Sequence, residues 1–300
     1  LSCMDSLLEL QVLDPDNPRF GQVIMPDNNR SSTTPAAAVV TPGLLNPAYM
    51  NEALIRRAVI QSLSELVWMQ GDDLLRTQTL KETSYPITGI IFSYNVLVAE
   101  QYYMLKDYVD EETRELWKQA VMCVADKLAD FKGYQSNQWS FMMLGHLNAY
   151  LATGEDRILG YFERQMNAYV ENTHGVSNKF GQHPAGYYLE EFGPDGNYDS
   201  LNAYHIGAAY NLYQELQSAK PELVQKMHDA IEKNLEFKQF FWLRQPDDRL
   251  YAPTAFNCRV DASISAQNYP GDYIVRSEFP LALRRYQLNV RTPDMKASGS

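Results

Sequence analysis

The sequence predicts an all-α fold made of antiparallel helical hairpins. Seven segments with apolar residues at helical spacing follow one another between positions 47 and 244, and mostly short loops join them. Short connections make neighbouring helices antiparallel. The resulting hairpin spans roughly 40 to 50 residues, the size of the repeating unit in helical arrays. We therefore expect an α/α toroid or an incomplete toroid, with an open solenoid as the alternative.

Start and stop signals delimit the expected helices. The first follows Asn46-Pro47, a cap residue and a proline, and ends at Gly71. Gly133 and Gly154 end the third and fourth helices, and Pro221 begins the seventh. The expected helices cover residues 47–71, 87–106, 111–132, 138–152, 156–170, 201–217 and the stretch from 221 onward.

Apolar stripes along the third and seventh helices predict their core faces. The stripe of the third helix consists of Leu116, Ala120, Val124, Leu128 and Phe131. The stripe of the seventh consists of Leu223, Met227, Ala230, Ile231 and Leu235. Cys123 lies on the apolar face of the third helix, so we expect it to pack in the core.

Changes in composition divide the chain into three regions. Residues 1–46 are rich in turn signals and predict an irregular N-terminal arm. Residues 47–244 form the expected helical toroid domain. Residues 245–300 carry several prolines, among them Pro246, Pro253, Pro270 and Pro280, between aromatic and β-branched residues. This last region is expected to be irregular or partly extended, and to be the start of a further domain that has been removed.

Composition narrows the classes of partner. The chain is 45% hydrophobic and 21% charged, as in ordinary globular proteins. Its net charge of −11 argues against binding nucleic acid through a basic surface. Twenty tyrosines against twelve phenylalanines suit a carbohydrate site, because sugar rings stack on aromatic faces that also carry a hydrogen-bonding group. Tyrosines lining half-buried helix rims are the equally weighted alternative.

Cysteines and apolar runs give further expectations. The three cysteines, Cys3, Cys123 and Cys258, have no zinc or disulfide spacing. The sequence contains no run of eighteen apolar residues, so we expect no membrane span. Leu1-Ser2-Cys3 resembles the remnant of a lipoprotein cleavage site. We expect a secreted or periplasmic protein, including the case of an outer-surface lipoprotein.

Three polar segments lie at expected helix starts or junctions: residues 134–139, 174–184 and 190–205. The third holds four carboxylates, two tyrosines, two asparagines and a histidine within sixteen residues, around a Gly-Pro-Asp-Gly turn at 193–196. Polar residues on loops of a rigid frame are the usual composition of a binding site. These segments are therefore the candidate site.

The motifs resemble those of polysaccharide lyases built on α/α toroids: the chondroitin and hyaluronan lyases, the alginate lyases and the heparinase II/III group. In those families an Asn-Trp type segment opens one helix, and a later Asp-Gly turn leads to a helix that carries a catalytic tyrosine. Asn137-Gln138-Trp139 is similar to the first element. Asp195-Gly196-Asn197-Tyr198 followed by Tyr204-His205 is similar to the second. The resemblance covers residues 110–215 and departs from the pattern at Gln138, which separates the asparagine from the tryptophan.

The resemblance implies β-elimination on a polysaccharide that contains uronic acid. A donor must bind the substrate carboxylate so that charge is stabilised in the enolate-like transition state, and Asn137 and His183 are the candidates. Tyr204 is the expected base or acid, with His205 either supplying positive charge beside a phenolate or acting as the base. The expected substrate-binding residues are Tyr134, Trp139, Gln182, Asp195 and Tyr198.

Other hypotheses remain open at this stage. A glycoside hydrolase on the same scaffold would use a carboxylate pair from Glu190, Glu191, Asp195 and Asp199. A non-catalytic glycan-binding protein also suits the aromatic loops. Several candidates have ordinary structural explanations: Asn137 as a helix cap, Asp195 in a plain turn, and solvated glutamates. We expect no metal and no cofactor, since His174, His183 and Asp195 match no zinc spacing.

Overall fold

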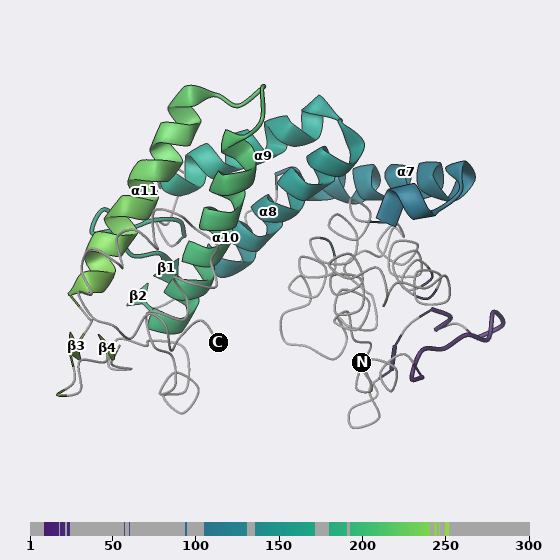
Figure 1. Cartoon of the computed structure of the whole chain (residues 1–300), viewed down its shortest axis with the longest axis horizontal. Coiled ribbons are helices and arrows are strands. Elements are labelled where there is room, and N and C mark those ends of the chain that lie inside the picture. Colours follow the sequence, from purple (N-terminus) through teal and green to yellow (C-terminus); the bar gives the residue numbers. More distant parts are fainter. Residues whose placement is uncertain are drawn as a thin grey trace. The chain divides into compact units, whose positions relative to one another are not determined.

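The computed structural model describes residues 9–17, 19–21, 23–24, 57, 60, 94, 105–130, 136–171, 180–190, 193–240, 243–244, 246 and 250–251. Within these residues the chain is mostly helical (Figure 1), which confirms the all-α class. The closure of the helices into a toroid stays a prediction. Most of the expected helices 47–71 and 87–106, and most of the two terminal regions, lie outside the described residues.

The described helices follow in order along the chain, with only short strands between them. A 3-10 helix, η2 (Lys106–Tyr108), precedes α7 (Glu111–Leu128), α8 (Ser136–Thr153), α9 (Asp156–Val170), α10 (Gly196–Gln214) and α11 (Pro221–Gln239). Two antiparallel pairs complete the described elements: β1 (Leu189–Glu190) with β2 (Gly193–Pro194), and β3 (Leu243–Arg244) with β4 (Leu250–Tyr251). Among these described helices none is long and apolar enough to cross a membrane.

The chain forms two compact units. The first unit comprises residues 1–131 and 145–160, and the second comprises residues 132–144 and 161–300. Helices α8 and α9 each contribute to both units. The candidate polar segments at 134–139, 174–184 and 190–205 all belong to the second unit.

In the first unit, α7 begins as its sequence predicts, and Ala120, Val124 and Leu128 of its expected stripe are buried; Leu116 is the exception. The Asp110 side chain accepts a hydrogen bond from the Thr113 backbone N–H at 2.7 Å, a normal N-cap. Leu116, which was expected in the core stripe, is 52% exposed, and Trp117 is fully buried in its place. Each helical residue turns the side chain by about 100°, so the large indole one position later sets the buried face. Cys123 is correspondingly half-buried and not a core residue.

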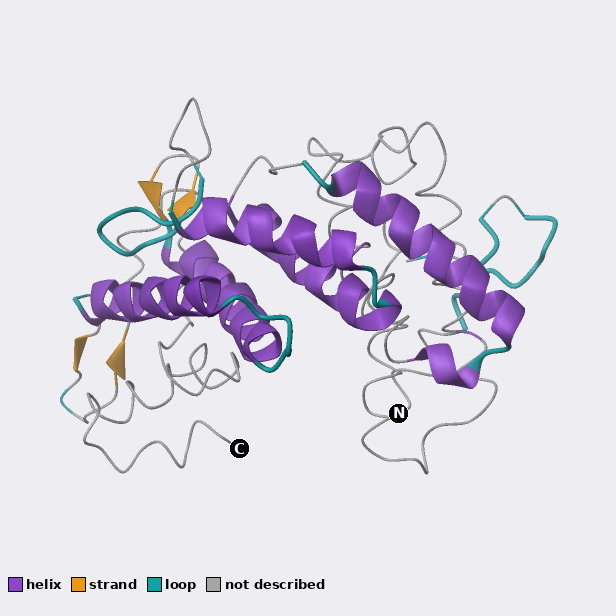
Figure 2. Ribbon diagram, turned by 90° about the horizontal axis from the view of Figure 1, so that it is seen from above, coloured by secondary structure: helices purple, strands orange, loops and turns teal. Residues whose placement is uncertain are grey.

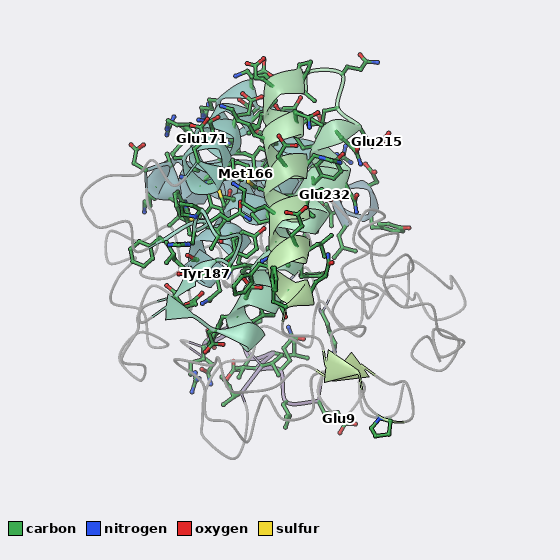
Figure 3. The ribbon with its side chains drawn as sticks, turned by 90° about the vertical axis from the view of Figure 1, so that its left-hand side faces the viewer. Glu9, Met166, Glu171, Tyr187, Glu215 and Glu232 are labelled. Carbon is green, nitrogen blue, oxygen red and sulfur yellow. The ribbon has the colours of Figure 1, made fainter. Side chains whose placement is uncertain are left out.

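In the second unit, α10 and α11 lie side by side and antiparallel (Figures 1 and 2). The turn between them is held by Tyr213, whose hydroxyl donates to Glu163 Oε1 at 2.7 Å and accepts from the Lys220 backbone N–H at 2.8 Å. Pro221 then occupies the first helical position, as its sequence predicts. Met166 lies buried among the helices of this unit (Figure 3).

Candidate functional site

The third polar segment contains the start of helix α10. The helix begins at Gly196, where the sequence indicated a turn, an aromatic stretch and a start at Leu201. Asp195 is fully buried and caps the helix: its Oδ1 accepts from the Tyr198 backbone N–H at 3.1 Å, and its carbonyl accepts from the Asp199 N–H at 2.7 Å. Asp195 thus has a structural role, which was the alternative to ligand binding.

The early start of α10 places three polar positions on one side of the helix. Tyr198, Asn202 and His205 are four and three residues apart, so their side chains project from the same face. Asn202 is fully buried, and His205 is 5% exposed. The Asn202 Nδ2 donates to the Tyr198 carbonyl at 2.8 Å. This face is where α10 contacts the first turns of α8.

Ser140 of α8 joins these polar groups to Asn137. Its hydroxyl lies 2.9 Å from Asn202 Oδ1, 3.0 Å from the Asn137 carbonyl and 2.9 Å from His205 Nδ1. The hydroxyl of Tyr169 also donates to Asn202 Oδ1, at 2.7 Å. Positions 137 and 205, which are far apart in the sequence, therefore lie in one hydrogen-bonded cluster.

Glu190 closes the cluster from strand β1. Its carboxylate accepts hydrogen bonds from the Asn137 backbone N–H at 3.2 Å and from Asn137 Nδ2 at 3.0 and 3.1 Å. Asn202 Nδ2 contributes another contact at 3.3 Å. Glu190 is 2% exposed, so the expectation of a solvated glutamate is wrong. A buried carboxylate requires such donors. In this structure the Asn137 Nδ2 group donates to Glu190.

Burial sets the charge of His205. The imidazole contacts the Phe141 ring at 4.7 Å and a serine hydroxyl, and no carboxylate is among its hydrogen-bond partners in the described residues. Removal from water lowers the pKa of His205 from 6.5 to about 3. The ring is neutral near pH 7, so His205 cannot supply the positive charge that a Tyr204 phenolate was expected to need. A weakly basic imidazole is also a poor acceptor for a carbon-bound proton.

Tyr204 is the exposed member of the group. It is 39% exposed, and its ring meets the His205 ring edge to face at 5.6 Å. Tyr204 is thus partly accessible to solvent, while its neighbour His205 stays in the buried cluster. The cluster and this phenol together form the candidate site.

Comparisons with protein families, characterised proteins and solved structures found no match to this chain. The candidate site is therefore argued from its own geometry.

The other expected substrate-binding residues are placed as follows. Trp139 is fully buried, and its indole N–H donates to Gln165 Oε1 at 3.2 Å. Gln182 is buried, and its Nε2 donates to the Gly186 carbonyl at 3.0 Å and to the Ala230 carbonyl. Tyr198 is half-buried, and Tyr134 lies outside the described residues. In this structure Trp139 and Gln182 are buried, and their hydrogen bonds stabilise the fold, so they are not placed to contact a ligand.

His183 lies in a separate part of the second unit. Its ring stacks on Tyr187 with centroids 4.5 Å apart, and both residues are half-buried. The Ala185 backbone N–H donates to His183 Nδ1 at 3.0 Å. In the neutral ring the proton must then reside on Nε2, which makes His183 a hydrogen-bond donor. This is the property expected of a group that binds a carboxylate.

Asp199 forms a second buried cluster that holds α10 against α11. Its carboxylate accepts from the Tyr188 backbone N–H at 2.7 Å and from Asn234 Nδ2 at 3.0 and 3.1 Å. Lys238 Nζ lies 3.4 Å away, and burial lowers the pKa of this lysine against the opposing effect of Asp199. Asp199 is fully buried and committed to these partners.

Sequence reasoning missed several residues that organise the site. Ser140, Asn202 and Asn234 received no role, although each is a polar residue that falls among buried helical positions. A polar side chain inside an apolar stripe is the signal that identifies such residues, because burial demands a partner. Within the described part of the chain, no group of three His, Cys, Asp or Glu residues is arranged to hold a metal ion.

The lowered pKa of His205 predicts a loss of stability in acid. The unfolded chain binds a proton near pH 6.5 and the folded chain only near pH 3, so stability falls as pH decreases through this window. The slope due to one such group is about 1.4 kcal/mol per pH unit. His205→Asn keeps an amide donor for Ser140 but cannot titrate. We therefore expect the free energy of unfolding of this variant to change less with pH between pH 3 and 6.5. Urea unfolding at several values between pH 4 and 7 measures it, and parallel curves for both proteins would contradict the assignment.

Proposed function

We propose that the second unit carries the active site of a polysaccharide lyase that cleaves a uronic-acid-containing polymer by β-elimination, on a scaffold that is an α/α toroid or part of one. The observation that supports the proposal is the pairing of an exposed phenol, Tyr204, with a buried neutral His205 that Ser140 links to Asn137. We also propose export of the protein to where such polymers are found.

In the proposed reaction Tyr204, as the phenolate, accepts the C5 proton and then donates a proton to the leaving C4 oxygen. β-Elimination breaks the C5–H and C4–O bonds, forms the C4–C5 double bond and delivers a proton to the leaving oxygen. Tyr204 is 39% exposed, and its phenolate is a stronger base than His205, whose basicity burial lowers. His183, with its Nε2–H, is the proposed donor to the substrate carboxylate. Asn137 supports the site through Glu190 instead of binding substrate directly.

The same geometry gives less support to a glycoside hydrolase. That mechanism needs two carboxyl groups that face the glycosidic bond. Asp195 caps α10, Asp199 binds Tyr188 and Asn234, and Glu190 binds two asparagines. These three are buried, and each is committed to donors from the protein itself; Glu191, the fourth candidate, lies outside the described residues.

The test is a screen of the purified chain against alginate, glycosaminoglycans, ulvan and pectic polymers. We expect ultraviolet absorbance from an unsaturated uronate to increase with at least one of them. Reducing sugar released from a neutral polymer without that absorbance would favour the hydrolase. Binding without turnover on every polymer would favour a glycan-binding protein and reject the proposal.

A further inference from the structure

The hydrogen bonds around Ser140 determine which nitrogen of His205 carries its proton. The orientation of the Asn202 amide is fixed first. Its Nδ2 lies 2.8 Å from the Tyr198 carbonyl and 3.3 Å from Glu190 Oε1, both acceptors, so the nitrogen must face them. The Oδ1 of Asn202 then faces the hydroxyls of Tyr169 and Ser140 and accepts from them.

The Ser140 hydroxyl has a single proton for three close neighbours. Two of these neighbours, Asn202 Oδ1 at 2.9 Å and the Asn137 carbonyl at 3.0 Å, have only lone pairs to offer. If the proton pointed to His205, two buried oxygen–oxygen contacts would lack any hydrogen. The proton therefore lies toward one of the oxygens, and the third neighbour, His205 Nδ1 at 2.9 Å, must donate to Ser140 Oγ.

We propose that Ser140 and Asn202 are positioning residues that hold His205 in the tautomer with its proton on Nδ1, which leaves Nε2 as a hydrogen-bond acceptor in the site. No hydrogen bond to Nε2 comes from the described residues, and His205 is 5% exposed. Beside Tyr204, Nε2 accepts a hydrogen bond from a hydroxyl group of the ligand and cannot donate to a carboxylate. This catalytic use rests on the proposed function, whereas the tautomer itself does not.

His183 provides an internal comparison, because its geometry requires the opposite tautomer. The backbone N–H of Ala185 donates to His183 Nδ1, so the proton of the neutral ring is on Nε2. The structure therefore assigns His205 to bind a donor and His183 to bind an acceptor.

The experiment is ¹⁵N NMR of the whole chain with labelled histidine, without any substrate. The chain contains five histidines, and His205→Asn and His183→Asn assign the two signals of interest. We expect the Nδ1 of His205 to show the shift of a protonated nitrogen and its Nε2 that of an unprotonated one, unchanged from pH 8 down to 5. The reverse pattern for His205 in the wild-type protein would overturn the proposal.

A matched pair of serine variants tests the positioning role. Ser140→Ala removes the oxygen that accepts from Nδ1, so we expect the two nitrogen shifts of His205 to move toward each other as both tautomers become populated. Ser136→Ala is the control, since Ser136 accepts from the Gly181 backbone N–H at 2.9 Å and has no contact with His205 among its hydrogen bonds. Unchanged His205 shifts in folded Ser140→Ala would reject the role of Ser140. If Ser140→Ala does not fold, the wild-type tautomer decides. A wild-type protein with the expected tautomer but no activity in the polymer screen would reject only the lyase.

Discussion

Replacing Tyr204 by phenylalanine is expected to lower kcat/KM about 10²- to 10⁴-fold on the polymer that the wild-type protein cleaves. The change removes one hydroxyl group and keeps the ring, so the edge-to-face contact with His205 at 5.6 Å is retained. Tyr204 is 39% exposed, and substitutions at such exposed positions usually change stability little. The loss should therefore appear in kcat, measured as the initial rate of absorbance increase, with an unchanged unfolding midpoint.

Tyr210→Phe is the matched control for this variant. Tyr210 lies on the same helix α10, is half-buried and has its ring 6.3 Å from that of His228. We expect wild-type rates from Tyr210→Phe. Full activity of Tyr204→Phe, or an equal loss in both variants, would show that the Tyr204 hydroxyl does not take part in proton transfer.

Asp199→Ala is expected to lower the free energy of unfolding by about 3–5 kcal/mol, because it removes one partner of a buried ion pair. Lys238 would then be a buried charge without its carboxylate, and the Tyr188 backbone N–H and Asn234 Nδ2 would lose an acceptor. Urea unfolding at pH 7 measures the change. Asp199→Asn, which keeps one acceptor oxygen but loses the charge, should fall between the wild-type protein and the alanine variant.

Asp229→Ala is the control for Asp199→Ala, because it removes an exposed carboxylate from α11. The Asp229 side chain is 65% exposed on α11 and accepts from Gln225 Nε2 at 2.7 Å. Exposed pairs of this kind contribute little, so a change within about 0.5 kcal/mol is expected. A similar small change for Asp199→Ala would mean that Asp199 is not the clamp between α10 and α11.

Local signals were sufficient to predict several helices. Asp110 caps α7, Gly154 adopts a φ of 72° after α8, and Pro221 begins α11, as the sequence indicates. These signals act within one or two turns, so they need no knowledge of the tertiary structure. The start of α10 was misplaced because Gly193-Pro194-Asp195-Gly196 has the composition of a free turn. Only the structure shows that Asp195 caps a helix that begins at once.

The roles of the site residues could not be predicted from local signals in the same way. The sequence singled out Asn137, Tyr204 and His205 by residue type, but it left Glu190 as a solvated or a catalytic carboxylate and His205 as a cation or a base. The structure buries Glu190 against two asparagines and surrounds His205 with neutral groups. The charge of an imidazole depends on its solvation, and solvation depends on packing. No local pattern contains that information.

The sequence by itself determined that the described part of the chain is mostly helical, where most described helices begin, and which short segments hold its polar residues. Caps, breakers and apolar spacing are properties of a few neighbouring residues. Tertiary structure decided which polar groups are buried together, which nitrogen of His205 is protonated and which tyrosine remains exposed. Those properties arise from contacts between positions as distant as 140 and 205, where burial forces each donor to find an acceptor.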